Sequence, residues 1–207
     1  VTCDSRFLCK HLFMPVLEPS SPQEIKDFID LAFKLSARSE LFAGLIITTN
    51  LADGGGTVEC KPNHYPRLNT AAKTELDTSR IDISRRVMLP PATCIQEKSF
   101  TDRHARAMQV ARELGINRIE HKPVTGQKAP IGFVATGVGY GYLVQALHEM
   151  QCLGKFPIAK LGLSYPVDPT MIRELSEQCE RIVVVEERRG FMEEQIAAII
   201  TADAQSG

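Results

Sequence analysis

Acidic and basic side chains are concentrated near the end of the sequence, directly after a short apolar run, RIVVV at 181–185. The charged residues of this group are Glu186, Glu187, Arg188, Arg189, Glu193 and Glu194. Helix dipoles stabilise negative charge at a helix start, and open α/β sheets bind ligands beside the carboxyl ends of their strands. The group predicts either a capped, solvated helix start or a functional contact at a subunit or domain interface, carried by Glu186, Glu187 and Glu194.

A glycine-rich turn is the second candidate for chemistry. TGVGYG at 136–141 follows an apolar run and opens a helical pattern, where glycines can let the backbone approach the pyrophosphate of a dinucleotide. The spacing is GxGxG rather than GxGxxG, and the next apolar run, PIAKLGL at 157–163, ends without the acidic residue that would hold a ribose hydroxyl. A tight strand-to-helix turn is therefore favoured over a nicotinamide or flavin site.

The sequence gives little indication of a metal site or of a catalytic nucleophile. The cysteines are Cys3, Cys9, Cys60, Cys94, Cys152 and Cys179. None of them forms a CxxC pair, so they are expected to be buried free thiols in a reducing compartment. The histidines contain no HxH or HxxxH pair, and no serine lies in a GxSxG turn. The sequence predicts that the chain by itself binds no metal ion and no iron–sulfur cluster.

The first part of the chain shows the alternation of a parallel α/β unit. SPQE at 21–24 predicts a capped helix start, and LFAGLIITT at 41–49 is typical of a strand covered on both faces. From 51 to about 86 the composition predicts a long, partly mobile surface excursion. RVMLPPAT at 86–93 predicts a short edge segment, followed by a helix over 99–114.

The second part of the chain has the clearest pattern. After a predicted linker at 121–130, three apolar runs at 131–135, 157–163 and 181–185 each precede an amphipathic helical pattern. Three such units in series make a parallel sheet with right-handed crossovers. We therefore expect an α/β protein with two parallel-sheet units, residues 1–120, including the excursion at 51–85, and residues 131–207.

Composition and charge limit the classes of partner that the chain is expected to bind. A net charge of -1 leaves no surplus positive charge for nucleic acid or anionic lipid. No run approaches the roughly 20 apolar residues of a membrane span, and the first residues lack the pattern of a signal peptide. The sequence predicts a cytoplasmic protein without nucleic-acid or membrane partners.

Three stretches resemble one family, the 2-oxoacid:ferredoxin oxidoreductases. Asp4-Ser5-Arg6 followed by MPVLEPSSPQEIKDFIDLAFKLS resembles the second half of their pyrimidine domain, where a QDSR turn precedes a P-x-x-E-P-S-x-x-Q-E passage. VMLPPAT resembles the segment that leaves this domain in the indolepyruvate branch. ATGVGYGYLVQAL, LGLSYPVDPTMI and VVVEERRGFMEEQI resemble successive units of the transketolase-C-terminal-like domain.

The resemblance implies an intact enzyme that oxidatively decarboxylates a 2-oxoacid, indolepyruvate or another aryl pyruvate, to an acyl-CoA. Its cofactors would be thiamine diphosphate, magnesium and iron–sulfur clusters, and its partners coenzyme A, ferredoxin and the remaining domains and subunit of an oligomer. The family's activating glutamate, magnesium motif and cysteine clusters have no counterpart in this sequence. The chain is therefore expected to be a part of such an enzyme that is inactive alone. A non-catalytic α/β interaction or regulatory module derived from one is the alternative.

No catalytic residue of the family can be placed on this sequence. By resemblance Asp4, Ser5 and Arg6 would lie at the edge of the cofactor and substrate pocket. Arg6 could bind a substrate carboxylate, or it could form a structural salt bridge with Asp4 or with a neighbouring subunit. Glu18 precedes a proline, so backbone geometry rather than chemistry explains its position.

Overall fold

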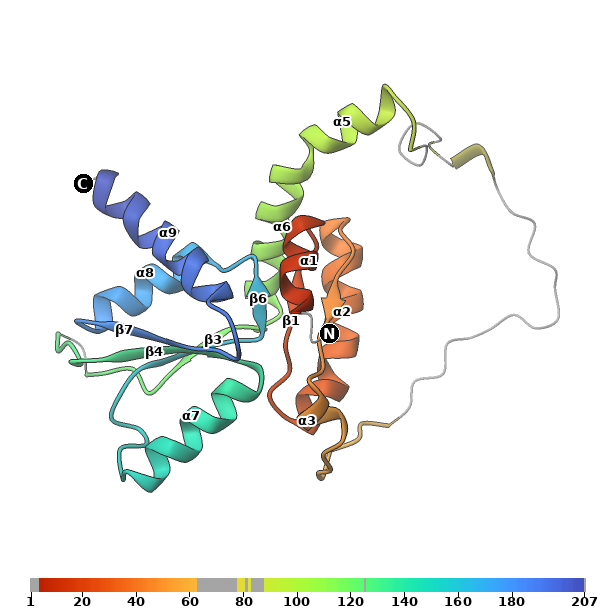
Figure 1. Cartoon of the computed structure of the whole chain (residues 1–207). Coiled ribbons are helices and arrows are strands. Elements are labelled where there is room, and N and C mark those ends of the chain that lie inside the picture. The colour runs from red at the N-terminus through yellow and green to blue at the C-terminus, as the bar shows by residue number, and fades with distance from the viewer. Residues whose placement is uncertain (1–3, 63–77, 81, 83–87, 125, 207) are drawn as a thin grey trace.

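The computed structural model describes residues 4–62, 78–80, 82, 88–124 and 126–206. Within these ranges the strands form two small sheets, a three-stranded sheet in the order β2-β1-β6 and a four-stranded sheet in the order β3-β5-β4-β7. Figure 1 shows α7 on one face of the larger sheet and α8 and α9 on the other. The predicted α/β fold class is confirmed.

The larger sheet contains the three strands that the second part of the sequence predicts. These are β4 (Gly132–Thr136), β5 (Ile158–Leu161) and β7 (Ile182–Val185), and β4 pairs in parallel with both of the others. Their helices are α7 (Gly137–Glu149), α8 (Pro169–Gln178) and α9 (Phe191–Ser206). A fourth strand, β3 (Arg118–Glu120), adds an antiparallel edge beside β5.

The smaller sheet joins segments that lie far apart in the sequence. β1 (Val16–Leu17) pairs in parallel with β2 (Gly44–Leu45) and antiparallel with β6 (Leu163–Tyr165). Each sheet therefore contains one strand from the other part of the chain. β6 follows the segment 121–130 but belongs to the smaller sheet, and β3 precedes that segment but belongs to the larger one. The predicted division of the chain into domains at this segment stays a proposal.

Gly162 lies where the predicted strand 157–163 divides into β5 and β6. A Cβ atom at this position would lie 2.5 Å from the carbonyl oxygen of Ile116 and 2.7 Å from the ring of Phe28. Only a residue without a side chain allows this close approach of the two chain segments. The chain can therefore leave one sheet and enter the other within two residues.

The longer helices of the first part are α1 (Ser5–His11), α2 (Pro22–Ser39), α5 (Ala92–Lys98) and α6 (Phe100–Glu113). The predicted helices at 21–24 onward and 99–114 are confirmed. The Ser21 hydroxyl accepts a hydrogen bond from the Glu24 amide at 3.2 Å, which is the predicted cap. Phe28 and Leu35 of α2 pack with Val110 and Ala111 of α6 in one buried cluster.

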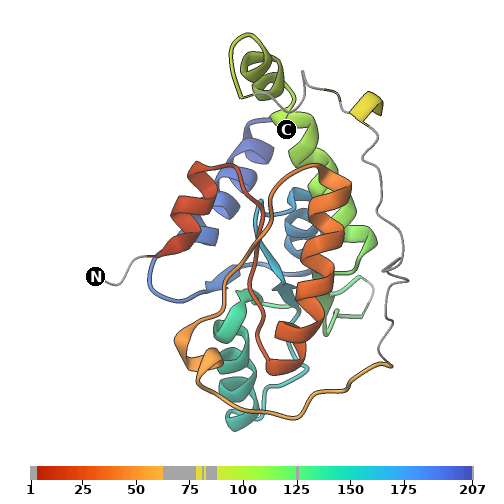
Figure 2. The ribbon, with the colours of Figure 1, turned by 90° about the vertical axis from the view of Figure 1, so that its right-hand side faces the viewer.

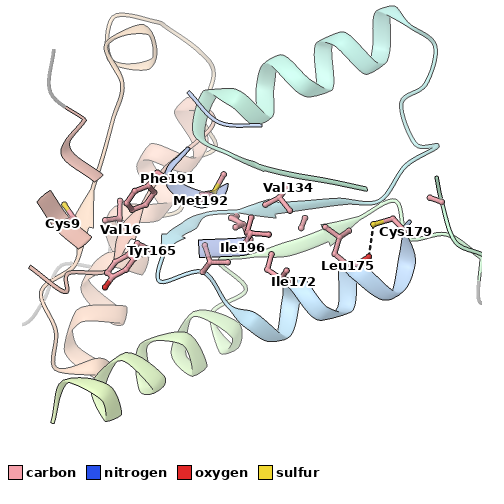
Figure 3. Close-up of a cluster of buried hydrophobic side chains, with 14 residues drawn as sticks. Cys9, Val16, Val134, Tyr165, Ile172, Leu175, Cys179, Phe191, Met192 and Ile196 are labelled. Atoms are coloured by element: carbon pink, nitrogen blue, oxygen red, sulfur yellow. Dashed lines mark hydrogen bonds between the residues drawn. The ribbon is translucent and has the colours of Figure 1, made fainter. Parts of the chain in front are cut away.

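A second buried cluster crosses from one sheet to the other. It unites Val134 of β4 with Ile172 and Leu175 of α8, and it continues through Phe191 to Val16 of β1. Figure 3 shows these side chains between the strands and the helices. Burial of this continuous apolar surface is the main term that holds the two sheets together.

Two expectations need correction or fall partly outside the described residues. Residues 89–91 form a turn that leads into α5, and Met88 is 75% exposed, so the predicted edge segment at 86–93 is wrong for its described part. Pro91 is the N-cap of α5, and two successive prolines cannot donate to a ladder. Short helices α3 (Thr49–Ala52) and η1 (Thr78–Arg80) flank or interrupt the predicted excursion, of which 63–77, 81 and 83–85 lie outside the described residues.

None of the helices in the described ranges combines the length and the apolar character that a membrane crossing requires.

Candidate functional site

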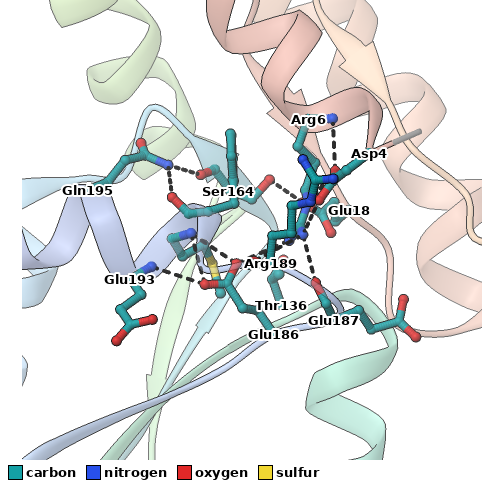
Figure 4. A network of polar contacts seen from close by, with 12 residues as sticks. Asp4, Arg6, Glu18, Thr136, Ser164, Glu186, Glu187, Arg189, Glu193 and Gln195 are labelled. Carbon is teal, nitrogen blue, oxygen red and sulfur yellow. Dashed lines mark hydrogen bonds and ion pairs between the residues drawn. The ribbon is translucent and has the colours of Figure 1, made fainter. Parts of the chain in front are cut away.

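Arg6 is the centre of a buried polar network that brings the two groups of predicted site residues together. Asp4 is the N-cap of α1, and Arg6 donates to both of its carboxylate oxygens, at 2.9 and 2.7 Å. Arg6 also donates to the Glu186 carboxylate at 3.2 Å and to the Glu187 carbonyl oxygen at 2.8 Å. Figure 4 shows the guanidinium between these partners. This arrangement matches the alternative in which Arg6 forms a structural salt bridge with Asp4.

Burial alone would raise the pKa of Asp4, but the hydrogen bonds and the positive charge of Arg6 outweigh burial and lower it. Burial alone would lower the pKa of Arg6, but the hydrogen bond with Asp4 and the negative charges of Glu18, Asp4 and Glu186 together outweigh burial and raise it. Both groups are therefore charged at neutral pH. A buried arginine between carboxylates keeps the first turn of α1 fixed against the end of β7.

Glu186 connects Arg6 to the start of α9. Its carboxylate accepts hydrogen bonds from the amides of Met192, at 2.9 Å, and Glu193, at 3.1 Å, in the first turn of α9. This is the capped helix start that the sequence offered as one interpretation. Of the other predicted interface residues, Glu194 is 61% exposed and pairs with Lys10 at 3.0 Å, and Ser5 is exposed at the start of α1.

Glu18 lies close to Arg6 in Figure 4 and is 7% exposed. Its carboxyl group accepts a hydrogen bond from the hydroxyl of Ser164 on β6. Gln195 of α9 donates to the Ser164 carbonyl oxygen at 3.1 Å, so the network ties together β1, β6 and α9. Burial raises the pKa of Glu18, against the opposing effects of Ser164 and Arg6. From the sequence, the position of Glu18 is explained by the proline that follows it. Its burial could not be predicted, because Ser164 on β6 is 146 positions away.

The glycines of the turn at 136–141 are explained by packing. Gly137 has a φ of +51°, and a Cβ atom there would lie 3.4 Å from the Glu18 carboxylate. A Cβ atom at Gly139 would lie 3.2 Å from the carbonyl oxygen of Val185 in β7. The Thr136 hydroxyl donates to the Leu161 carbonyl oxygen at 2.7 Å instead of capping α7. This is the tight strand-to-helix turn that the spacing favours.

A second network, around Lys160, was missed from the sequence. Lys160 is 1% exposed on β5, forms an ion pair with Glu24 of α2, and lies 4.8 Å from the centre of the Tyr140 ring. The Tyr140 hydroxyl donates to Glu120 at 2.8 Å. Burial lowers the pKa of Lys160 to about 8. The only sequence signal is one lysine inside the apolar run PIAKLGL.

The described residues contain no group of three or more histidine, cysteine, aspartate or glutamate side chains that could hold a metal ion. Of the cysteines in the described ranges, Cys9 and Cys179 are buried, Cys60 and Cys94 are exposed, and Cys152 is partly exposed. The expectation that the free thiols are buried is therefore wrong for Cys60 and Cys94.

Replacing Glu18 with glutamine should change the pH dependence of stability. Above the ordinary glutamate pKa of 4.5 the unfolded chain has released a proton that the folded protein still holds. The stability contributed by protonated Glu18 is fully present below that pKa and is lost as the pH rises through the raised folded pKa. Glu18→Gln should therefore lose less stability than the natural protein as the pH rises toward neutrality in urea denaturation. Exposed Glu97→Gln is the control, and identical pH profiles for all three proteins would contradict the effect.

Comparison with known proteins gives one consistent group of relatives. Residues 121–206 match the family model of the indolepyruvate oxidoreductase domain. The chain is 27% identical over 201 residues to the indolepyruvate oxidoreductase subunit IorA of Methanothermobacter marburgensis, covering 97% of this chain and 30% of that protein. It is 29% identical over 196 residues to IorA of Methanothermobacter thermautotrophicus, covering 95% and 30%.

IorA of Thermococcus kodakarensis is 28% identical over 193 residues, covering 93% of this chain and 29% of that protein. Among solved structures, the 2-oxoglutarate:ferredoxin oxidoreductase from Magnetococcus marinus, with 2-oxoglutarate, coenzyme A and succinyl-CoA bound, matches with a TM-score of 0.41. That match has 17% identity and covers 54% of this chain and 19% of that chain. The chain spans about 30% of the length of the curated relatives it matches. Residues 121–206 are thus similar to the indolepyruvate oxidoreductase domain, and 93% to 97% of the chain is similar to IorA subunits.

Proposed function

We propose that this chain is part of a thiamine-diphosphate-dependent oxidoreductase that acts on indolepyruvate or another aryl pyruvate. The observation that carries the proposal is the similarity to IorA subunits over 93% to 97% of the chain. The reaction would convert one 2-oxoacid and one coenzyme A into acyl-CoA, carbon dioxide and a proton, while two electrons pass through iron–sulfur clusters to ferredoxin. The protein would work in the cytoplasm as an oligomer.

In this proposal the chain supplies a wall of the cofactor pocket and a subunit contact. Asp4, Ser5 and Arg6 would border the pocket, and Glu186, Glu187 and Glu194 would face a neighbouring subunit or domain. The Arg6 guanidinium suits a carboxylate, but its donors already go to Asp4, Glu186 and Glu187. A substrate carboxylate would have to displace one of these partners. We place the magnesium and cluster sites in the rest of the intact enzyme.

The test compares the chain alone with the reassembled enzyme. Titration calorimetry with thiamine diphosphate and magnesium should give no saturable heat at sub-millimolar concentrations for the chain alone. Mixing it with the remaining domains and subunit should produce dye reduction that depends on an aryl pyruvate and coenzyme A. No activity after assembly would favour the alternative, a non-catalytic interaction or regulatory module, and tight cofactor binding to the chain alone would contradict its assignment as a pocket wall.

A further inference from the structure

The Arg6 network contains more acidic than basic side chains. Its acids are Asp4, Glu18 and Glu186, and within the described ranges Arg6 is the one cation that forms an ion pair with any of them. All four side chains are buried. If all four were ionised, the group would carry a formal charge of -2. Uncompensated buried charge is costly, so one of the three acids is expected to retain a proton.

Glu18 is the acid that receives the fewest hydrogen bonds. Asp4 accepts two hydrogen bonds from the Arg6 guanidinium, at 2.9 and 2.7 Å. Glu186 accepts from Arg6 at 3.2 Å and from two amides in the first turn of α9. Among the described residues, only the Ser164 hydroxyl bonds to the Glu18 carboxyl group. Burial raises the pKa of Glu18, in agreement with this difference, so Glu18 is the acid that retains the proton.

Ser164 can serve both forms of Glu18. A hydroxyl group donates one hydrogen bond and can also accept. Besides Glu18, the Ser164 hydroxyl has the carbonyl oxygen of Val16 within reach, at 3.5 Å. A protonated Glu18 can donate to the Ser164 oxygen while Ser164 donates to Val16, and an ionised Glu18 can accept from Ser164. Glu18 can therefore change its charge without moving β1 away from β6.

An ionised Glu18 competes for the Arg6 guanidinium. Burial lowers the pKa of Arg6, and among the charges that oppose burial, that of Glu18 has a larger effect than those of Asp4 and Glu186. On its other side Glu18 faces the start of α7, where a Cβ atom at Gly137 would lie 3.4 Å from its carboxylate. The Glu186 contact is the one that Arg6 can release most easily. It is longer than both contacts with Asp4, and Glu186 keeps its two amide partners in α9.

Two further ionisable groups lie near this site. Burial and the Glu18 carboxylate raise the pKa of the Cys9 thiol on α1, so this thiol is neutral at neutral pH. The positive charge of Arg188, in the turn after β7, acts on Asp4 from a distance. The change of charge near neutral pH therefore belongs to Glu18.

We propose that Glu18 is a proton-controlled switch that selects the partners of Arg6. With Glu18 protonated, Arg6 bonds to Asp4, Glu186 and Glu187 and holds α1 against the end of β7. When Glu18 releases its proton to solvent, Arg6 turns toward Glu18 and leaves Glu186 and Glu187, which loosens α1. Figure 2 shows α1 beside the first turns of α9, so this contact joins the first part of the chain to the second. The inference involves no oxoacid and no cofactor, so it does not depend on the proposed function.

Amide hydrogen exchange of the 207-residue chain at several pH values tests the switch. After correction for the intrinsic exchange rate, the protection of the α1 amides should fall about ten-fold between about pH 5, just above the ordinary glutamate pKa of 4.5, and about pH 8. Glu18→Gln cannot ionise, so its α1 amides should lose less than about two-fold in protection over the same range. His11, His104 and Lys160 are present in both proteins, so the difference between the proteins isolates Glu18. The same pH dependence in both proteins would overturn the proposal.

NMR of the side chains follows the two partners directly. The carboxyl carbon of Glu18 should titrate above the ordinary pKa of 4.5, and the Arg6 Nε signal should shift along the same curve. Ser164→Ala removes a donor that favours the ionised form, so it should move both curves and the loss of α1 protection to higher pH. An Arg6 signal that stays constant while Glu18 titrates would refute the switch, and so would curves that move to lower pH in Ser164→Ala.

Discussion

Lys160→Met is expected to lower the free energy of unfolding by about 3 kcal/mol. The ammonium group of Lys160 is buried and forms an ion pair with Glu24, which is 16% exposed. Removal of Lys160 leaves the Glu24 carboxylate with the hydrogen bonds from Ser20 and with the more distant Arg118, at 3.5 Å. Little water replaces the lost ammonium group, which is costly in a buried site. The loss would fall at the contact between the first turn of α2 and β5. Urea denaturation at neutral pH measures it.

The double variant Lys160→Met, Glu24→Gln is the matched control. A glutamine oxygen can still accept the bond that the Ser20 amide donates to Glu24 at 2.9 Å, and no unpaired charge remains. The double variant should therefore recover most of the stability that the single variant loses. In the natural protein, stability should rise between the lowered Lys160 pKa of about 8 and its ordinary value of 10.5, because the folded protein there binds fewer protons than the unfolded chain. A single variant as stable as the natural protein would contradict the role of the pair.

Arg6→Met is expected to lower the free energy of unfolding by about 3 to 5 kcal/mol. Arg6 is 5% exposed, and its loss would leave the Asp4 and Glu186 carboxylates facing each other without a positive charge. The contact of the guanidinium with the Phe191 ring, 5.1 Å from its centre, would be lost as well. Thermal and urea unfolding should both report the change.

Two further variants distinguish a structural role of Arg6 from a role in substrate binding. Arg6→Met combined with Asp4→Asn should regain part of the stability, since one unpaired carboxylate is removed. Arg6→Lys should keep the charge but lose the two-point contact with Asp4. In the reassembled enzyme, an Arg6→Lys protein of near-natural stability should show a raised apparent Michaelis constant for the oxoacid if Arg6 also borders the pocket. An unchanged constant would restrict Arg6 to the salt bridge.

Much of the fold follows from patterns within a few residues. The start of α2 is encoded by Ser21 and Glu24, three residues apart, and the start of α8 by Asp168, whose side chain accepts from the Thr170 amide at 3.0 Å. Apolar runs likewise predict β4, β5 and β7, because a strand buried on both faces needs apolar side chains along its whole length. The family resemblance also depends on such short stretches, so it could be stated from the sequence.

The sequence by itself determined the fold class, most of the helices and the strands β4, β5 and β7, because caps, helical periodicity and apolar runs are properties of neighbouring residues. It also carried the family resemblance. Only the tertiary structure decided which strands pair and which charges are buried, because these depend on residues far apart along the chain. Arg6 and Glu186 are 180 positions apart, and Glu24 and Lys160 are 136 apart. No local sequence pattern identifies the partner of a buried charge, because such a pair forms only when distant segments of the chain fold onto each other.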